Sequence, residues 1–259
     1  MAIRHKLEMY NFKNGFETKN AILHTPFNPE VIFIGTFNHG WDWNNADFYY
    51  GRGMYMWTIL GNLFLHNKID ALIYKRTSVQ GNNHNPTVDE IFEICKRGRI
   101  TFADVVLGTI RNLSVEKNPY KQSVLVNNSF EWKGYKDKPL DKMGANGWLE
   151  DNVSNIITYI KQTGSIKHVY FTFKSGGWLA KKMNLIIEGI QPVSACSIFT
   201  PTGNGFRKNL HFPYNLRSKS LAHCWVWNKR LHMIPVHKPG YGHLDHGWLR
   251  AHQVNPDNF

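Results

Sequence analysis

The segment from Val31 to Gly40 constrains the fold of this chain more than any other, because an unbroken apolar run ends there in a short polar turn. The apolar residues do not alternate with polar ones, which is typical of a parallel strand that is buried on both faces. A helix is expected at 54–64, after the turn. In α/β folds the polar residues that follow such a strand line the ligand site. The segment therefore predicts the first half of a βαβ unit.

The rest of the chain continues this alternation of strands and helices. Because parallel neighbours need crossover connections of a dozen or more residues, the pattern predicts an α/β fold, a three-layer α/β/α sandwich with a central four-stranded parallel sheet. Further strands are expected at 100–107, 168–173 and 193–200, and further helices at 87–97, 149–162, 178–187 and 221–231.

The chain has no Pro/Ser/Gly-rich linker that would divide it, so we expect a single domain over residues 1–259. Residues 113–145 are rich in Asn, Lys, Gly and Pro and are interpreted as an insertion that forms a solvated loop. Residues 232–259 form a His-rich extension. Its histidines lack the spacing of known zinc motifs, so a surface or DNA-facing role is favoured there over a metal site.

Composition narrows the class of partner and the compartment. Cys95, Cys196 and Cys224 are too few and too scattered for a disulfide framework or an iron–sulfur cluster. No apolar stretch approaches the about 18 residues that span a bilayer, and the first residues do not resemble a signal peptide, so a soluble cytoplasmic protein is expected. The net charge of +12, with 14% aromatic residues, suits a partner that offers phosphates and bases, although a generic basic surface is the alternative.

Short motifs at the four expected strand ends, taken in order, resemble the uracil-DNA glycosylase superfamily, particularly its mismatch-specific and hypoxanthine-type branches. The resemblance covers roughly residues 30–230, and ordered agreement of four motifs is more specific than any one of them. The motifs are GTFNHG at 35–40, FYYGRGMYMWTIL at 48–60, GRITFADVVL at 98–107 and TPTGNG at 200–205.

The resemblance implies a monofunctional DNA base glycosylase, which hydrolyses the N-glycosidic bond of a nucleotide swung out of the duplex. DNA is then the partner, with no membrane and no obligatory protein partner. No metal and no cofactor are required. The enzyme would serve DNA repair or, if the base is a hypermodified one that viruses install, antiviral defence.

The resemblance also implies candidates for the group that places the hydrolytic water. In many members this is an Asn or Asp two residues after the loop glycine, and here that position is Phe37, with Asn38 one later. Either Asn38 takes the role, or the carboxylates Asp42 and Asp47 do. The alternative for Asn38 is that it only caps a turn.

Asp104 stands where uracil-reading relatives carry an Asn that pairs with the base. An ionised carboxylate only accepts hydrogen bonds, so Asp104 favours a base that offers N–H groups, such as hypoxanthine or a modified cytosine, over uracil. Capping of the next turn is its alternative role. Some relatives carry a His at the position of Thr200 to stabilise the leaving base, and His39 or His211 would have to stand in for it. Further base-binding candidates are Phe37, Tyr49, Tyr50 and Thr200, with core packing as the rival role of the aromatic residues.

DNA contacts are expected from the last motif and from basic residues beside it. The loop at 200–205 offers backbone N–H groups to a phosphate, and a basic run follows it. A Lys-Ser-Gly-Gly turn after the third strand is a second phosphate candidate, although both basic segments can also be ordinary solvated surface. These DNA-binding candidates are Thr202, Gly203, Asn204, Arg207, Lys208, Lys174 and Ser175.

Two hypotheses from other classes compete with the glycosylase. A catalytically inactive nucleic-acid-binding protein of the same fold would explain why Phe37 replaces the residue that handles water. A His-dependent metal hydrolase would act through the C-terminal extension. Chelation of metals separates the last hypothesis from the first, because a glycosylase of this kind needs no metal.

Overall fold

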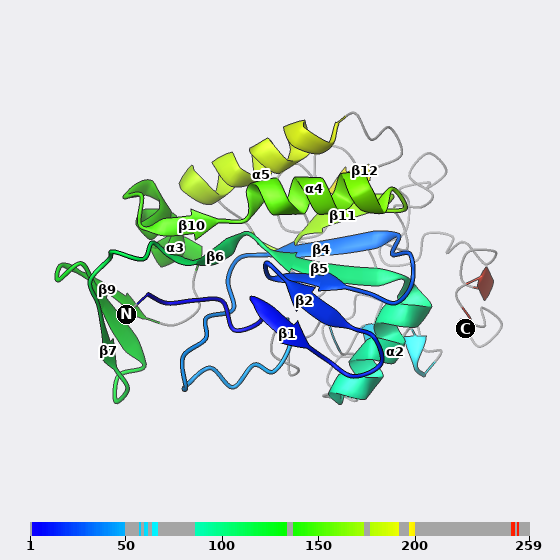
Figure 1. Cartoon of the computed structure of the whole chain (residues 1–259), viewed down its shortest axis with the longest axis horizontal. Helices are drawn as coiled ribbons and strands as arrows, with labels where there is room; N and C mark the ends of the chain where they lie inside the picture. Colours follow the sequence, from blue (N-terminus) through cyan, green and yellow to red (C-terminus); the bar gives the residue numbers. More distant parts are fainter. Residues whose placement is uncertain are drawn as a thin grey trace, which may run out of the picture.

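A computed structural model describes residues 2–49, 57, 60, 61, 64–66, 86–133, 137–173, 177–191, 197–199, 250, 251 and 253 of the chain. Within them the fold is a mixed α/β one, in which helices pack on both faces of a seven-stranded sheet (Figure 1). The predicted α/β class is confirmed at this level. Most of residues 200–259, including the expected helix at 221–231 and most of the His-rich extension, lie outside the described residues.

The main sheet is mixed, which corrects the expectation of a central sheet made of four parallel strands alone. Its order is β1-β2-β3-β5-β4-β11-β12. The strands β5, β4, β11 and β12 are parallel neighbours, and β1, β2 and β3 continue the sheet beyond β5 in antiparallel pairing. The strands are β1 (Met9–Asn11), β2 (Glu17–Lys19), β3 (Ile22–His24), β4 (Val31–Gly35), β5 (Ile100–Asp104), β11 (His168–Phe171) and β12 (Ser197–Phe199).

The three added strands are too short for sequence periodicity to reveal them. Each has three residues, and tight turns join them. The turns contain residues with positive φ, namely Asn14 and Gly15 in the first turn and Asn20 and Ala21 in the second. Asn and Gly tolerate this left-handed conformation best.

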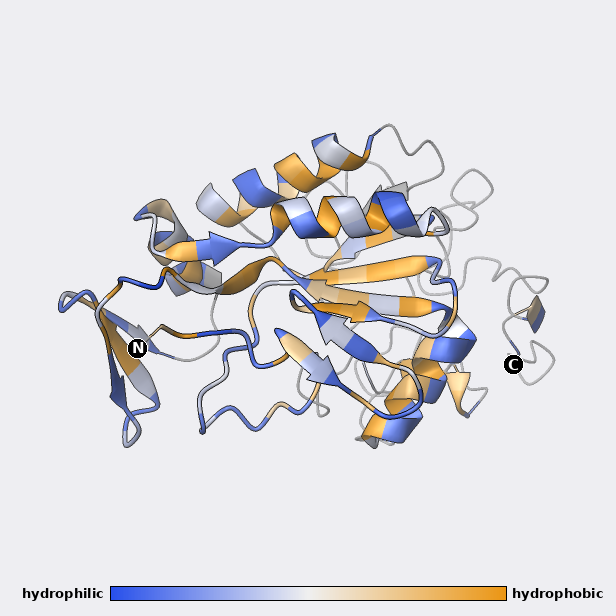
Figure 2. Cartoon of the chain, in the orientation of Figure 1, coloured by the Kyte–Doolittle hydropathy of each residue, from blue (hydrophilic) through white to orange (hydrophobic). Residues whose placement is uncertain are grey.

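Alternating side chains of the parallel strands build two cores, one on each face of the sheet. Val31 and Phe33 of β4 pack with α2 (Val88–Gly98), while Ile32 and Ile34 pack with α4 (Val153–Thr163) and α5 (Gly177–Ile190). Figure 2 shows this apolar interior along β4 and β5. The sequence predicted α2 well, because the side chain of Thr87 accepts from the Glu90 backbone N–H and Glu90 returns the bond, a complete capping box.

Residues 113–145 are largely folded, so the expectation of a solvated loop is wrong. They contain the antiparallel strands β7 (Val115–Asn118), β8 (Ser123–Val126) and β9 (Phe130–Lys133), followed by α3 (Asp137–Ala145). Val124, Val126 and Trp132 are buried and join the core beneath α4 and α5. The polar composition hid these few apolar residues, which alternate across a strand pair as half-buried strands require.

Two predicted elements are divided in the structure. The strand expected at 100–107 ends as β5 at Asp104 and resumes as β6 (Val106–Thr109), which pairs with β10 (Leu149–Asp151). The helix expected from residue 149 therefore begins only at Val153. The buried Asn152 stands between β10 and α4, where its side-chain amide donates to the carbonyl of Asp104 at 3.0 Å and to that of Asn20.

Of the helix expected at 54–64, residues 57, 60, 61 and 64 are helical and the others lie outside the described residues. Among the residues that the structure places, no helix has the length and apolarity needed to cross a membrane. The single domain over residues 1–259 stays a prediction.

Candidate functional site

The carboxyl ends of the parallel strands meet at one edge of the sheet. β4 comes first in the chain, β5 second on one side of it and β11 third on the other. Gly35 at the end of β4 is level with Asp104 of β5, and Ile34 is level with Phe171 of β11. The connection from β4 to β5 contains α2 on one face of the sheet, and the connection from β11 to β12 contains α5 on the other face. Such a switch point between neighbouring strands, here β4 and β11, is where open α/β sheets bind ligands. Residues 36–40 and 172–173, which follow β4 and β11, lie at that edge.

The first residues of the chain complete this edge, which the sequence did not indicate. Residues 3–6 run extended between the loop after β4 and strand β6. On the β6 side, the N–H of His5 donates to the carbonyl of Leu107 at 2.8 Å. On the loop side, the N–H of Lys6 donates to the carbonyl of Asn38 at 2.7 Å, and the N–H of Gly40 donates to that of Arg4 at 2.8 Å. The segment therefore fixes the backbone of the loop that carries Asn38.

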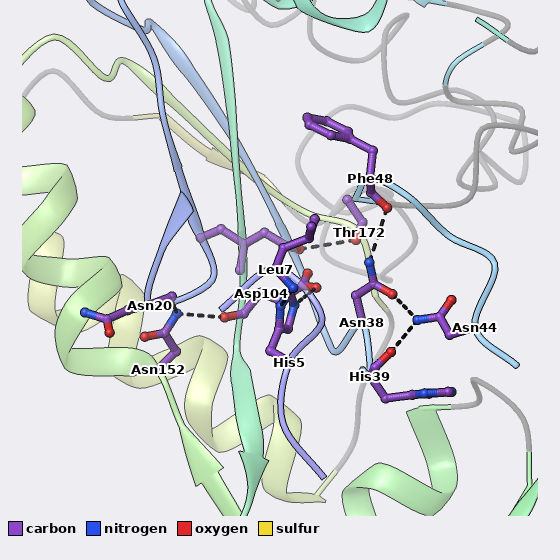
Figure 3. Close-up of polar contacts among 11 residues, drawn as sticks. His5, Leu7, Asn20, Asn38, His39, Asn44, Phe48, Asp104, Asn152 and Thr172 are labelled. Carbon is purple, nitrogen blue, oxygen red and sulfur yellow. Dashed lines mark hydrogen bonds and ion pairs between the residues drawn. The ribbon is translucent and has the colours of Figure 1, made fainter. Parts of the chain in front are cut away.

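His5 and Asp104 form a buried pair beneath this loop (Figure 3). The imidazole Nε2 lies 2.8 Å from Oδ2 of Asp104, and Nδ1 accepts the backbone N–H of Leu7 at 3.0 Å. Because Nδ1 acts as an acceptor, a neutral His5 carries its proton on Nε2 and donates it to the carboxylate. The two nitrogens of His5 are thus both occupied by the protein.

This pairing changes the role expected for Asp104. Asp104 is level with the end of β4, as predicted, and Oδ2 of its side chain is in hydrogen-bond contact with His5. Capping of a turn, the alternative, does not describe it either. Sequence reasoning missed His5 because 99 residues separate the partners and no local pattern marks a single histidine near the N-terminus.

Asn38 is buried, and its side chain is held in one orientation. Its Oδ1 accepts from the amide of Asn44, and its Nδ2 donates to the carbonyl of Phe48 at 3.3 Å. The same amide of Asn44 donates to the carbonyl of His39, so Asn44 ties the loop together (Figure 3). A carboxamide has two N–H groups and two lone pairs, so these contacts leave one of each. Asn44 was not predicted, and only its Asn/Asp-rich surroundings at 38–47 could have suggested it.

His39 follows Asn38 and lies in an aromatic group. Its ring centroid is 5.4 Å from that of Trp132, 6.2 Å from that of Trp41 and 6.0 Å from that of Trp43. Burial, aided by the charges of Lys6 and His5, lowers the pKa of His39 to about 4. His39 is therefore neutral near pH 7. Its Nδ1 accepts the backbone N–H of Trp41 at 3.3 Å, which places the proton on Nε2.

The other predicted residues near this loop lie in three different environments. Asp42 has a side chain that is 94% exposed, 3.9 Å from Lys117, and Asp47 is half-buried. Phe37 is buried, with its ring centroid 6.0 Å from those of both His5 and Trp132. Tyr49 is fully buried, stacked on Phe102 at 5.6 Å, so the core-packing alternative describes it here.

The remaining predicted site residues lie outside the described residues, and their roles stay predictions. They include the whole of the last motif and the basic run that follows it. These residues are Tyr50, Thr200, Thr202, Gly203, Asn204, Arg207, Lys208, Lys174 and Ser175.

Among the described residues, no group of three or more His, Cys, Asp and Glu side chains could hold a metal ion. Comparison of the chain with family models, with curated proteins and with solved structures gives no match.

Proposed function

We propose that this chain is a DNA base glycosylase, which hydrolyses the N-glycosidic bond of a flipped-out damaged or modified base. The observation that carries the proposal is the placing of Asn38, His39 and Asp104 at the carboxyl edge where β4 separates β5 from β11. Open α/β sheets bind their ligands at switch points of this kind. The net charge of +12 suits the phosphates of DNA, and the ordered motifs resemble the uracil-DNA glycosylase superfamily.

The proposed chemistry uses the two groups that the loop after β4 presents. Departure of the base leaves a cationic sugar and an anionic base, so the site must place a water and donate to the base. The remaining N–H and lone pair of Asn38 would hold the water, because Asn44 and Phe48 already fix the carboxamide. We propose His39, which is neutral near pH 7, as the residue of this loop that stabilises the leaving base.

In this proposal Asp104 is a positioning residue instead of the group that reads the base. It holds His5, and residues 3–6 hold the backbone of Asn38. The preference for a base other than uracil rested on an Asp104 carboxylate that faces the base. Hypoxanthine, modified cytosines and uracil are therefore all tested as candidate bases.

The test is release of a base from a panel of DNAs. Duplexes and single strands that carry uracil, hypoxanthine or a modified cytosine are incubated with the protein, and hot alkali then breaks the strand at each abasic site. We expect release of one base class, unchanged by excess EDTA. Asn38→Ala should lower the rate by at least about a hundredfold, as loss of a positioned polar group does. Asn45→Ala is the matched control, because Asn45 is an exposed asparagine of the same loop.

The contrary outcomes are equally specific. Normal turnover in Asn38→Ala would transfer the water-handling role to Asp42 or Asp47. Release that EDTA abolishes would favour the metal hydrolase instead.

A nucleic-acid-binding protein without catalysis is the second candidate. It is favoured by the two bonds that tie the carboxamide of Asn38 to Asn44 and Phe48, since an asparagine used only to shape a loop would make the same bonds. Binding that persists while no base of the panel is released would establish this candidate.

A further inference from the structure

The strands β7, β8 and β9 form a separate three-stranded sheet, here called the arm (residues 115–133), which is docked on the loop of the candidate site. Trp132 of the arm stacks on Phe37 with 6.0 Å between ring centroids and meets His39 edge-on at 5.4 Å. Lys117 places its Nζ 5.5 Å from the ring centroid of Trp41. The base of the arm therefore contacts the residues on either side of Asn38.

The tip of the arm presents an aromatic ring to solvent. Tyr120 lies in the turn between β7 and β8 and is 98% exposed, the most exposed large apolar side chain among the described residues. The turn is braced, because the backbone N–H of Lys121 donates to Oδ1 of Asn118 at 3.1 Å and that of Gln122 donates to the carbonyl of Pro119 at 3.3 Å. The ring of Tyr120 thus contributes nothing to the core, yet its backbone is held in place.

Isolated exposed apolar residues are ordinary on protein surfaces, so exposure alone assigns no role. Three further features distinguish Tyr120. Exposed lysines, Lys117 and Lys121, lie on either side of it in the chain. The arm that carries it projects beside the carboxyl edge of the sheet (Figure 1). The chain as a whole is strongly basic. An aromatic ring between lysines offers a stacking face for a base and cations for its phosphates.

We propose that Tyr120 stacks on an unpaired base of the DNA strand that enters the site, while Lys121 contacts a neighbouring phosphate. The proposal rests on the proposed function and deepens it, because it assigns a substrate whose strand is single-stranded or opened beside the target base. The tip of the arm would hold the flanking nucleotide. The other end of the arm contacts the loop of Asn38 through Trp132.

The test measures binding separately from base release. The dissociation constants of the full chain are measured by fluorescence anisotropy for a single-stranded oligonucleotide and for a fully paired duplex of the same sequence. Tyr120→Ala should weaken binding to the single strand about tenfold, the effect of losing one stacking contact, and should weaken binding to the paired duplex less. Tyr120→Phe should bind as the wild type does, because it keeps the ring.

The matched control is Tyr10→Ala. Tyr10 is also exposed, at 52%, but it lies on β1, the edge strand of the main sheet, and not on the arm. Its substitution should leave binding unchanged. The logarithm of the association constant falls linearly with the logarithm of the salt concentration. Lys121→Gln should make this negative slope shallower by about one, whereas Lys161→Gln on α4 should leave it unchanged.

The stacking proposal is overturned if Tyr120→Ala binds the single strand as the wild type does, if Tyr120→Phe loses as much as Tyr120→Ala, or if Tyr10→Ala weakens binding equally. Failure of the proposed function is a different result. If no base of the panel is released but Tyr120→Ala still weakens binding, the glycosylase proposal fails and the arm stands. If a base is released while all variants bind alike, the glycosylase stands and the arm does not.

Discussion

At the scale of single residues, the pair of His5 and Asp104 is the contact on which the candidate site depends most. It buries a carboxylate oxygen and an imidazole in hydrogen-bond contact, far from each other in sequence. Such a pair adds little net stability when intact, but removal of one partner leaves the other with an unmet demand for a hydrogen bond. Its value here is positional, since it holds residues 3–6 against the loop of Asn38.

Removal of the imidazole should therefore destabilise the protein strongly. We expect His5→Ala to lower the free energy of unfolding by about 3 kcal/mol, because Asp104 loses its donor in a buried place. His5→Gln should recover part of the loss, since its amide can donate to the carboxylate. Urea unfolding checks both. His24→Ala, at a half-buried histidine, is the control and should cost less than half as much.

His39 should make stability depend on pH. Its pKa of about 4 in the folded protein lies below the unfolded value of 6.5, so the unfolded chain binds more protons between these values. Its contribution is present in full above pH 6.5 and is lost as the pH falls towards 4. Between pH 7 and pH 4 the loss should be about 3 kcal/mol.

The check for His39 is the difference in stability between wild type and His39→Gln, measured by urea unfolding from pH 7 to pH 4. The difference should fall as the pH falls. The pKa of His24 is also lowered, chiefly by burial, but that histidine is present in both proteins and cancels. A difference that stays constant with pH would show that His39 titrates normally.

At the scale of elements, the N-terminal segment acts as a strap that ties β6 to the loop after β4. The isolated bridges Arg4 to Gly108 and His5 to His39 define its two sides. The strap can approach β6 only because residue 108 is glycine. A Cβ at that position would lie 2.3 Å from the carbonyl oxygen of Ile3. Two backbones meet at that point, so no flexible side chain can move away.

Gly108→Ala should consequently displace the strap. We expect a loss of about 2 kcal/mol in the free energy of unfolding, within the range for overpacked sites, and faster hydrogen exchange at the N–H of Leu7. Gly164→Ala is the control. No atom lies within 4 Å of its added Cβ, so only the left-handed backbone, with φ of +64°, would cost about 1 kcal/mol. Exchange at Leu7 that is unchanged in Gly108→Ala would contradict the role of the strap.

At the scale of the whole molecule, the relevant properties are the single edge at which the parallel strands end and the excess of positive charge. The edge concentrates the loop of Asn38, the strap and the arm. The net charge of +12 is the sum over all 259 residues. Such a charge attracts a polyanion before any specific contact forms.

Affinity for DNA should therefore fall steeply with salt. Between 50 and 200 mM salt we expect the dissociation constant for a single strand to rise by at least about tenfold, as phosphate contacts release counterions. Anisotropy titrations at several salt concentrations measure this. An affinity that does not change with salt would contradict a DNA partner and with it both proposed functions.

What the sequence alone determined are the features that neighbouring residues encode. The apolar run at Val31 marks β4, and Thr87 before an apolar helical pattern marks the start of α2, because both signals lie within a few residues. The alternation of such elements predicted an α/β fold with four parallel strands, which are present as β4, β5, β11 and β12. It also predicted that Asn38 follows one of these strands and that Asp104 ends the next one along the chain.

Only the tertiary structure decided which side chains meet. The bond of His5 to Asp104, the strap beside Gly108 and the docking of Trp132 on Phe37 join residues that are about 100 positions apart. The short strands likewise gain their place by pairing, since β3 pairs with β5, β2 with β3 and β1 with β2. The physical reason is that such contacts form only when burial and backbone pairing bring distant segments together, and no local pattern of residues records that approach.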